Sequence, residues 1–267
     1  MRLGSKVAII TGGGKGIGKA IALAFAREGA TVVIASRRVS ALEETCREIT
    51  GSGGKATYVQ TDVAEEQQVQ RLVAETIRQF GQVDVLVNNS WVSGPTSRVA
   101  DMDLSEWNDT LAVDLTGSML CAREVLKHMM SRRTGNIINI VSEGGRSADG
   151  RSGYPFRAAY CCSKMGLIGL TETLSVEMGE YGIRVNAVSP GPVLGERIVN
   201  VLKKRVAETG KSFEEMMTTL AANNSLKRLA TEEECAAVAL FLASDESSGV
   251  TGQTIPEIGR ASCRERV

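Results

Sequence analysis

Short apolar runs alternate with amphipathic stretches along most of this chain of 267 residues. The apolar runs are rich in Val and Ile, and they predict strands at 7–10, 31–35, 57–60, 83–87, 137–141 and 183–189. Between the runs, apolar residues recur every three or four positions, which predicts helices at 19–27, 40–50, 65–80, 107–131 and 158–180. Short apolar strands between helices are typical of an α/β fold whose parallel sheet is covered on both faces.

The alternation continues without an internal repeat or a low-complexity linker. We therefore expect one domain over residues 1–259. Residues 192–226 follow a Pro-Gly turn and are polar with a helical pattern, which indicates an insertion that covers the sheet edge and the substrate. Residues 260–267 do not continue the pattern, and we expect them to form a non-native or disordered tail.

A glycine-rich loop, Thr-Gly-Gly-Gly-Lys-Gly-Ile-Gly, joins the first predicted strand to the first helix. Glycines let the backbone approach a pyrophosphate, and the helix N-terminus favours negative charge. A tight turn without a ligand is the alternative, but it does not require so many glycines. The loop predicts a doubly wound Rossmann-type sheet that binds a dinucleotide through Thr11, Gly12, Gly14, Lys15, Gly16, Ile17 and Gly18.

A second motif lies in the predicted helix 158–180. Tyr160 and Lys164 are four residues apart and share one helix face. An ammonium group beside a phenol favours the phenolate and lowers the phenol pKa from about 10, which suits proton transfer at an alcohol or ketone. Ser142 follows a predicted strand, and its hydroxyl can bind the substrate oxygen. A packed tyrosine beside a surface lysine would explain the pair alone, but Ser142 and the glycine loop favour a hydride-transfer enzyme.

Together these motifs resemble those of the short-chain dehydrogenase/reductase family in its compact single-domain form. The resemblance covers about residues 5–259, and the matching positions are 11–18, Asp62-Val63, Asn88-Asn89, Ser142, Tyr160, Lys164, Asn186 and Pro190-Gly191. It implies that Tyr160 is the general acid/base, that Lys164 also holds the nicotinamide ribose, and that Ser142 stabilises the substrate oxygen. It further implies a dimer or tetramer, and cofactor contacts from Asp62, Val63, Asn89, Pro190, Gly191 and Val193.

Two positions depart from the family pattern. Asp114 stands where the family usually has an asparagine that completes a proton relay. An ionised aspartate accepts hydrogen bonds but cannot donate them, so Asp114 is a weaker catalytic candidate. Trp91 replaces a glycine of the family's Asn-Asn-Ala-Gly turn, and it either forms a wall of the substrate pocket or only packs.

The end of the second predicted strand bears on the choice of cofactor. An NAD enzyme needs a carboxylate there to bind the ribose 2′-hydroxyl. This chain instead has Ser36, followed by Arg37 and Arg38, and Lys15 can converge on the same place. Two cations, Arg37 and Lys15, and a hydroxyl suit a 2′-phosphate, whereas two solvated arginines at a helix start are the alternative. We predict NADP(H) as the cofactor.

The substrate is less well defined than the cofactor. The loop from 143 to 159 is longer than the family's usual spacing, and its arginines suit either an anionic substrate or a solvated loop. Candidate pocket residues are Trp91, Ser142, Glu143, Gly144 and Phe156. We expect interconversion of a secondary alcohol and a ketone. The alternatives are reduction of a 3-oxoacyl thioester and a catalytically silent NADP(H)-sensing module.

Composition narrows the partners and the location. The formal net charge is zero, which gives no reason to expect nucleic acid or an anionic membrane as partner. No apolar run reaches the roughly 18–20 residues of a membrane span. The six cysteines match no zinc-site spacing, so no metal is expected. We expect a cytoplasmic enzyme that acts on a small molecule and forms homo-oligomers.

Overall fold

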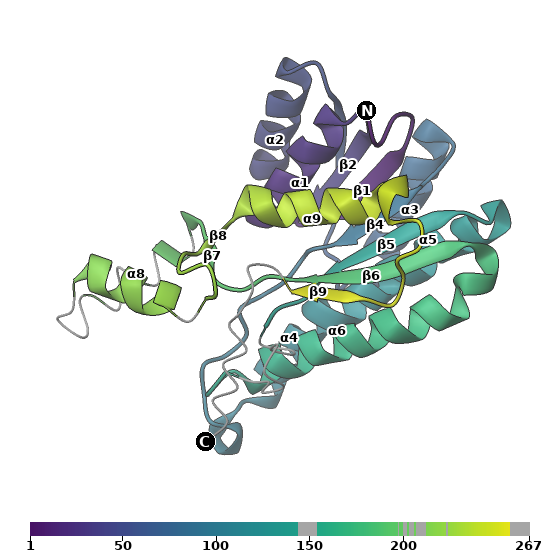
Figure 1. The fold of residues 1–267 in the computed structure, drawn as a ribbon. Helices are drawn as coiled ribbons and strands as arrows, with labels where there is room; N and C mark the ends of the chain where they lie inside the picture. The colour runs from purple at the N-terminus through teal and green to yellow at the C-terminus, as the bar shows by residue number, and fades with distance from the viewer. Residues whose placement is uncertain are drawn as a thin grey trace.

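The computed structural model describes residues 1–143, 154–196, 198–199, 202, 206, 212–222 and 224–256. Within them, seven parallel strands form one sheet in the order β3-β2-β1-β4-β5-β6-β9 (Figure 1). The strands are β1 (Val7–Thr11), β2 (Thr31–Ser36), β3 (Lys55–Gln60), β4 (Val85–Asn88), β5 (Gly135–Ile140), β6 (Ile183–Ser189) and β9 (Thr254–Pro256). The strand order reverses beside β1, because β2 and β3 lie on one side of it and β4 on the other. In open sheets of this kind, ligands bind outside the carboxyl ends of the strands at that reversal.

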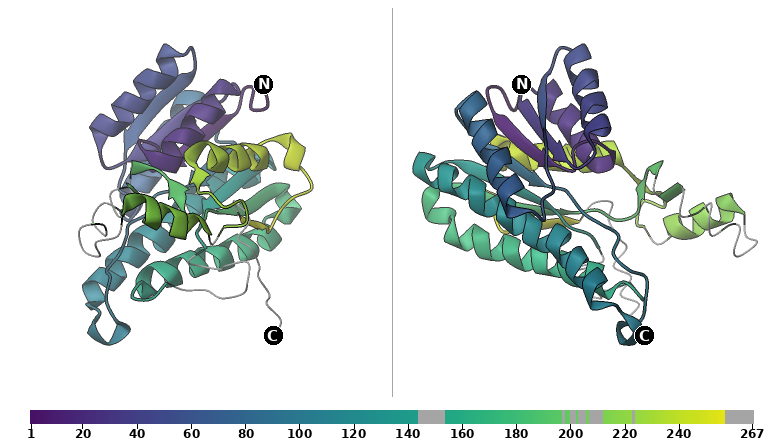
Figure 2. Two further views of the ribbon diagram at one scale, coloured as in Figure 1. Left: turned by 60° about the vertical axis from the view of Figure 1, so that its left-hand side comes forward. Right: turned by 180° about the vertical axis from the view of Figure 1, so that it is seen from behind.

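Helices cover both faces of the sheet. They are α1 (Gly16–Arg27), α2 (Val39–Gly51), α3 (Glu66–Phe80), α4 (Leu104–Leu111), α5 (Gly117–Arg132), α6 (Ala158–Glu177), α8 (Phe213–Ala222) and α9 (Glu232–Ala243). Ala8 and Ile10 of β1 pack with α1, α2 and α9, whereas Val7 and Ile9 pack with α3 and α5 (Figure 2). Successive strand residues thus enter opposite cores, which explains the unbroken apolar runs. The predicted Rossmann-type doubly wound sheet is confirmed.

The long helix predicted at 107–131 is divided in the structure. It begins at Leu104, where Asp103 caps the N-terminus by accepting hydrogen bonds from the backbone N–H groups of Ser105 and Glu106. Between α4 and α5 the chain makes a π-helical segment, Ala112–Thr116. Such segments are rare in proteins, and those that occur often lie at functional sites. Asp114 lies in the middle of this one and is buried.

Helix α9 and a small second sheet were not among the predicted elements. The second sheet pairs β7 (Val193–Leu194) with β8 (Ala230–Thr231). At the start of α9, Thr231 accepts a hydrogen bond from the N–H of Glu234, whose side chain in turn accepts one from the N–H of Thr231. This capping box fixes α9 where it packs beside α1.

Within the predicted insertion at 192–226, the structure describes β7, α8 and short segments between them. Helix α8 stands away from the main sheet, and none of its residues is fully buried (Figures 1 and 2). Its role as a cover for the substrate stays a prediction. The predicted tail at 260–267 lies outside the described residues.

Candidate active site

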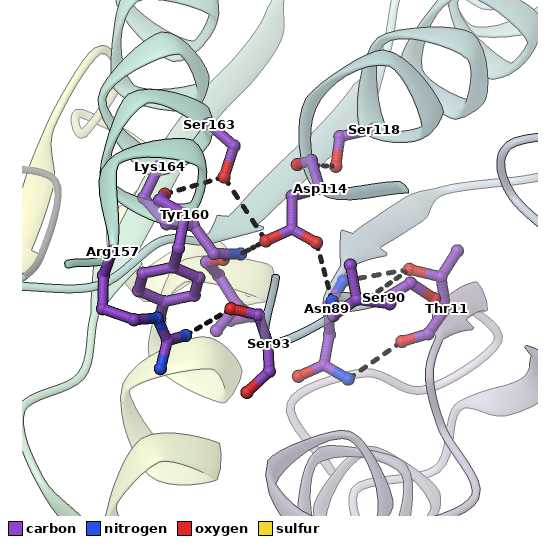
Figure 3. Close-up of polar contacts among 12 residues, drawn as sticks. Thr11, Asn89, Ser90, Ser93, Asp114, Ser118, Arg157, Tyr160, Ser163 and Lys164 are labelled. Atoms are coloured by element: carbon purple, nitrogen blue, oxygen red, sulfur yellow. Dashed lines mark hydrogen bonds and ion pairs between the residues drawn. The ribbon is translucent and has the colours of Figure 1, made fainter. Parts of the chain in front are cut away.

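Hydrogen bonds join the carboxyl ends of β1 and β4. The Asn89 side chain donates to the carbonyl oxygens of Thr11 and Gly12 at 3.0 and 3.3 Å. The Thr11 hydroxyl oxygen accepts from the backbone N–H groups of Asn89 and Ser90 at 2.9 and 3.0 Å (Figure 3). A side chain on Gly18 would overlap the Asn89 amide and the Gly12 carbonyl. The glycine loop and the turn after β4 are therefore one packed unit.

The start of α1 suits a dinucleotide phosphate. Gly16, the first residue of the helix, has a φ of +57°, and a Cβ there would meet nothing nearer than a Glu232 carboxylate oxygen at 3.6 Å. The N-cap residue, Lys15, makes no side-chain capping hydrogen bond, and the first turn of the helix itself holds no acidic residue. The free N–H groups and the positive end of the helix dipole are left for an anion. The residues present here therefore fit the predicted cofactor.

The ends of β2 and β3 carry the residues predicted to distinguish the two nicotinamide dinucleotides. Ser36 ends β2, and Arg38 is the N-cap residue of α2. Arg37 is 64 % exposed, and its guanidinium lies 3.7 Å from the carboxylate of Asp62 beyond β3. The ammonium of Lys15 lies 4.0 Å from the Glu196 carboxylate, and its convergence on the same place as Arg37 stays a prediction.

Tyr160 and Lys164 project from the first turns of α6. Lys164 is only 3 % exposed, and its ammonium donates a hydrogen bond to the Ile140 carbonyl at the end of β5 (3.2 Å). The same ammonium lies 5.8 Å from the centre of the Tyr160 ring. Tyr160 is buried as well, and its ring meets that of Trp91 edge-on at 6.1 Å. The predicted pair is thus assembled at the carboxyl end of β5.

Asp114 completes a buried charged cluster with Lys164 (Figure 3). Its carboxylate has no exposed surface, accepts the Val92 backbone N–H at 2.7 Å, and lies 3.9 Å from the Lys164 ammonium. The Ser163 hydroxyl lies within hydrogen-bond distance of it at 3.3 Å. Burial raises the pKa of Asp114 and lowers that of Lys164, while their mutual attraction opposes both changes. Asp114 therefore joins the π-helical segment, the turn after β4 and α6.

Ser142 and Glu143 follow β5 and are both buried. The Glu143 backbone N–H donates to the Pro190 carbonyl at 3.3 Å, which ties the end of β5 to the turn after β6. In that turn Gly191 faces the Glu143 carboxylate, which would lie 3.3 Å from a Cβ at Gly191. Ser142 thus lies two residues beyond the Ile140 carbonyl that binds Lys164. Gly144, also predicted for the pocket, lies outside the described residues.

Arg157 is one of the arginines of the 143–159 loop, for which the sequence left an anionic substrate or a solvated loop open. Its guanidinium carbon lies 5.2 Å from the centre of the Tyr160 ring, and its Nη2 donates to the Ser93 carbonyl (Figure 3). The available signal was its spacing, three residues before Tyr160. Phe156, predicted to line the pocket, is 52 % exposed and has a left-handed backbone with a φ of +64°.

Other kinds of site find less support in the part of the chain that the structure describes. Its residues form no cluster of three or more His, Cys, Asp or Glu side chains able to hold a metal ion. Among its helices, none combines the length and the apolar character that a membrane crossing requires.

A parallel sheet with a glycine loop at its reversal point and a Tyr–Lys pair beside it defines a class, the nicotinamide-dependent α/β oxidoreductases. A family model described as enoyl-(acyl carrier protein) reductase matches residues 12–257. The chain is 36 % identical to a 3-oxoacyl-[acyl-carrier-protein] reductase of Thermotoga maritima, over 96 % of this chain and 97 % of that one. This chain belongs to the short-chain dehydrogenase/reductase family.

Two solved structures show how closely the fold is shared. NAD⁺-bound xylitol dehydrogenase is 29 % identical with a TM-score of 0.88, over 97 % of this chain and all of that one. A variant of actinorhodin polyketide ketoreductase with NADPH is 32 % identical with a TM-score of 0.88, over 95 % of this chain and 96 % of that one. These two relatives hold different nicotinamide dinucleotides, so the family alone does not determine the cofactor.

Proposed function

We propose that this protein is an NADP(H)-dependent oxidoreductase that interconverts a secondary alcohol and a ketone. One observation carries the proposal: Tyr160 and Lys164 are buried together at the carboxyl end of β5, on the same edge of the sheet as the packed glycine loop and Asn89. A phenol and an ammonium buried side by side are an unfavourable arrangement for stability alone, because the cation loses its hydration. A proton-transfer role gives this arrangement a function.

The proposed reaction transfers a hydride and a proton by separate groups. A nicotinamide, when bound, would supply or take up the hydride. Tyr160 donates a proton to the ketone oxygen during reduction and accepts one from the alcohol during oxidation. Lys164 stabilises the phenolate form of Tyr160, and Ser142 donates a hydrogen bond to the substrate oxygen. Asp114 holds Lys164 in place through the 3.9 Å contact between their side chains.

Cofactor binding is assigned to three groups of residues. The glycine loop and the N-terminus of α1 hold the pyrophosphate, and Ser36, Arg37 and Arg38 hold a 2′-phosphate. The exposure of Arg37 supports this choice, because its long contact with Asp62 leaves the guanidinium accessible to a phosphate. By resemblance to the family, the remaining contacts come from Asp62, Val63, Asn89, Pro190, Gly191 and Val193.

Reduction of a 3-oxoacyl thioester is the second candidate activity. The 36 % identity to a 3-oxoacyl-[acyl-carrier-protein] reductase favours it, and it uses the same proton and hydride transfers. A catalytically silent NADP(H)-sensing module is the third reading. The burial of both Tyr160 and Lys164 argues against that reading, since a sensor does not need this pair.

The experiment that tests the proposal measures NADPH and NADH binding to the wild type and to Arg37→Ala. We expect the wild type to prefer NADPH, and Arg37→Ala to lose about tenfold in NADPH affinity with little change for NADH, because one charge-assisted contact is removed. Arg47→Ala is the matched control, since Arg47 is an exposed arginine in the middle of α2.

A panel of ketones, secondary alcohols and 3-oxoacyl thioesters then assigns the reaction. Turnover of simple ketones with NADPH supports the first candidate, and turnover of thioesters alone supports the second. Equal binding of NADH and NADPH by the wild type would show that the cofactor assignment is wrong. Tight NADPH binding without turnover of any compound would favour the sensing module.

A further inference from the structure

The ring of Tyr160 has two cations near it. Lys164 is one of them, with its ammonium 5.8 Å from the ring centre, and Arg157 is the other, with its guanidinium carbon at 5.2 Å (Figure 3). Both distances are within the range at which a cation is attracted to an aromatic face. Trp91 meets the ring edge-on. The ring is thus held by three side chains, and only Lys164 belongs to the motif that the family shares.

The guanidinium of Arg157 is fixed by the protein. Its Nη2 donates to the Ser93 carbonyl, and its Nε is buried without a hydrogen-bond partner among the described residues. An arginine free to move would turn that Nε toward water, since an unmade hydrogen bond of a buried charged group is costly. The contact with the Tyr160 ring and the hydrogen bond to Ser93 therefore hold the guanidinium in the observed position.

The backbone around Arg157 is also held from the turn after β4. The Phe156 carbonyl accepts the Ser97 N–H at 3.0 Å, and the Arg157 carbonyl accepts the Cys161 N–H at 2.9 Å. Phe156 has a left-handed φ of +64°, which is costly for a bulky residue and persists only where the surroundings enforce it. These contacts set the direction in which Arg157 leaves the start of α6.

The second cation has an electrostatic consequence for the tyrosine. Asp114 lies 3.9 Å from Lys164, so its negative charge offsets part of the effect of Lys164 on the phenol. Arg157 lies on the ring itself and adds positive charge there. The ionisation of Tyr160 is therefore governed by Asp114, Lys164 and Arg157 together.

We propose that Arg157 is a positioning residue for Tyr160, which fixes the ring beside Trp91 and supplies a second positive charge that favours the phenolate. The proposal rests on the proposed function, in which Tyr160 transfers the proton. It adds a residue to the site that the shared motifs do not contain.

The test compares Arg157→Met and Arg157→Lys with the wild type in the full-length chain. In alcohol oxidation, we expect the acidic limb of the kcat profile to move to higher pH by about one unit in Arg157→Met, because one nearby positive charge is lost. Arg157→Lys keeps the charge but not the guanidinium group, so we expect it to recover part of the shift. Arg133→Met is the matched control, because Arg133 lies 5.6 Å from the ring centre of Tyr181, outside the proposed site.

A spectroscopic titration makes the test independent of turnover. The chain has four tyrosines, and the difference in tyrosinate absorbance between the wild type and Tyr160→Phe isolates the ionisation of Tyr160. A shift to higher pH in Arg157→Met supports the proposal even where no substrate is turned over, in which case the proposed function alone fails. An unchanged titration and an unchanged kcat profile would overturn the proposal. An increase of KM limited to anionic substrates would also overturn it and make Arg157 a substrate ligand.

Discussion

The two ends of the candidate site are built differently. At the end that carries Tyr160, the charged groups are buried, with Asp114 at 0 % and Lys164 at 3 % exposure, and they join segments far apart in the chain. At the other end, Arg37 after β2 and Lys15 after β1 are 64 % and 54 % exposed, and their acidic partners lie 3.7 and 4.0 Å away. The side chains proposed for proton transfer are therefore buried parts of the fold, whereas the groups proposed for cofactor selection are surface side chains.

This difference has a physical reason. A buried ion pair is costly to form, and removing one partner leaves a charge without compensation, so the remaining structure strongly constrains such a pair. A surface pair contributes little to stability and exchanges its partner easily, for instance for a phosphate. We expect substitutions at the two ends to differ in the same way, with effects on the whole fold at one end and effects on binding alone at the other.

The largest effect is expected at Lys164. Lys164→Met leaves Asp114 buried and unpaired, and we expect it to lower the free energy of unfolding by roughly 3–5 kcal/mol and to abolish turnover. The measurement is urea unfolding followed by circular dichroism, with activity measured in parallel. The double variant Asp114→Asn/Lys164→Met removes both charges and should recover much of the stability but none of the activity. A Lys164→Met protein as stable as the wild type would show that the buried pair does not constrain the fold.

A smaller effect is expected from Asp114→Asn, which keeps the shape of the side chain and removes its charge. Ionised Asp114 offsets the positive charge of Lys164, so its replacement should favour the Tyr160 phenolate. The acidic limb of alcohol oxidation should then move to lower pH, opposite in direction to the expected shift for Arg157→Met. The kcat profiles of Asp114→Asn, of Arg157→Met and of the double variant Asp114→Asn/Arg157→Met measure both shifts. A move to higher pH in Asp114→Asn would contradict the arrangement of charges proposed above.

The pH dependence of the free energy of unfolding provides a second test of Asp114→Asn. Burial raises the pKa of Asp114 in the folded state above its value in the unfolded chain. Between these two pKa values the folded state binds more protons than the unfolded state, so the free energy of unfolding falls as pH rises. In Asp114→Asn this fall, which begins near the ordinary aspartate pKa of about 3.9, should be absent.

Much of the fold could be predicted from the sequence, because the central strands β1, β2 and β4 are buried on both faces and therefore read as nearly unbroken apolar runs. Helix α9 was missed for a related reason. Its buried residues Cys235, Ala236 and Ala239 are followed on the other face by Val238 and Phe241, which are apolar although only partly buried, so the helix lacks the polar face that marks an amphipathic pattern. The π-helical segment was missed because a local change of helical period leaves no clear trace in the spacing of apolar residues.

Contacts within the site could be predicted from the sequence where both side chains lie on the same helix. Tyr160 and Lys164 could be paired because they are one turn apart on a single helix. The contact of Lys164 with Asp114 and the bond from Arg157 to the Ser93 carbonyl join segments that are distant in sequence. No local spacing encodes such contacts, and the same holds for the unexpected pairing of Lys15 with Glu196.

The smallest effect is expected on the stability of Arg37→Ala. Because Arg37 is mostly exposed, the loss of its contact with Asp62 should change the free energy of unfolding by less than about 1 kcal/mol, even where NADPH affinity falls. The same urea titration used for Lys164→Met measures it, with Arg47→Ala as the control. If Arg37→Ala lowered the free energy of unfolding by several kcal/mol, Arg37 would also stabilise the fold. The contrast between the two ends of the candidate site would then not hold. A stable Arg37→Ala protein with weakened NADPH binding would instead localise cofactor selection to side chains that the fold does not need.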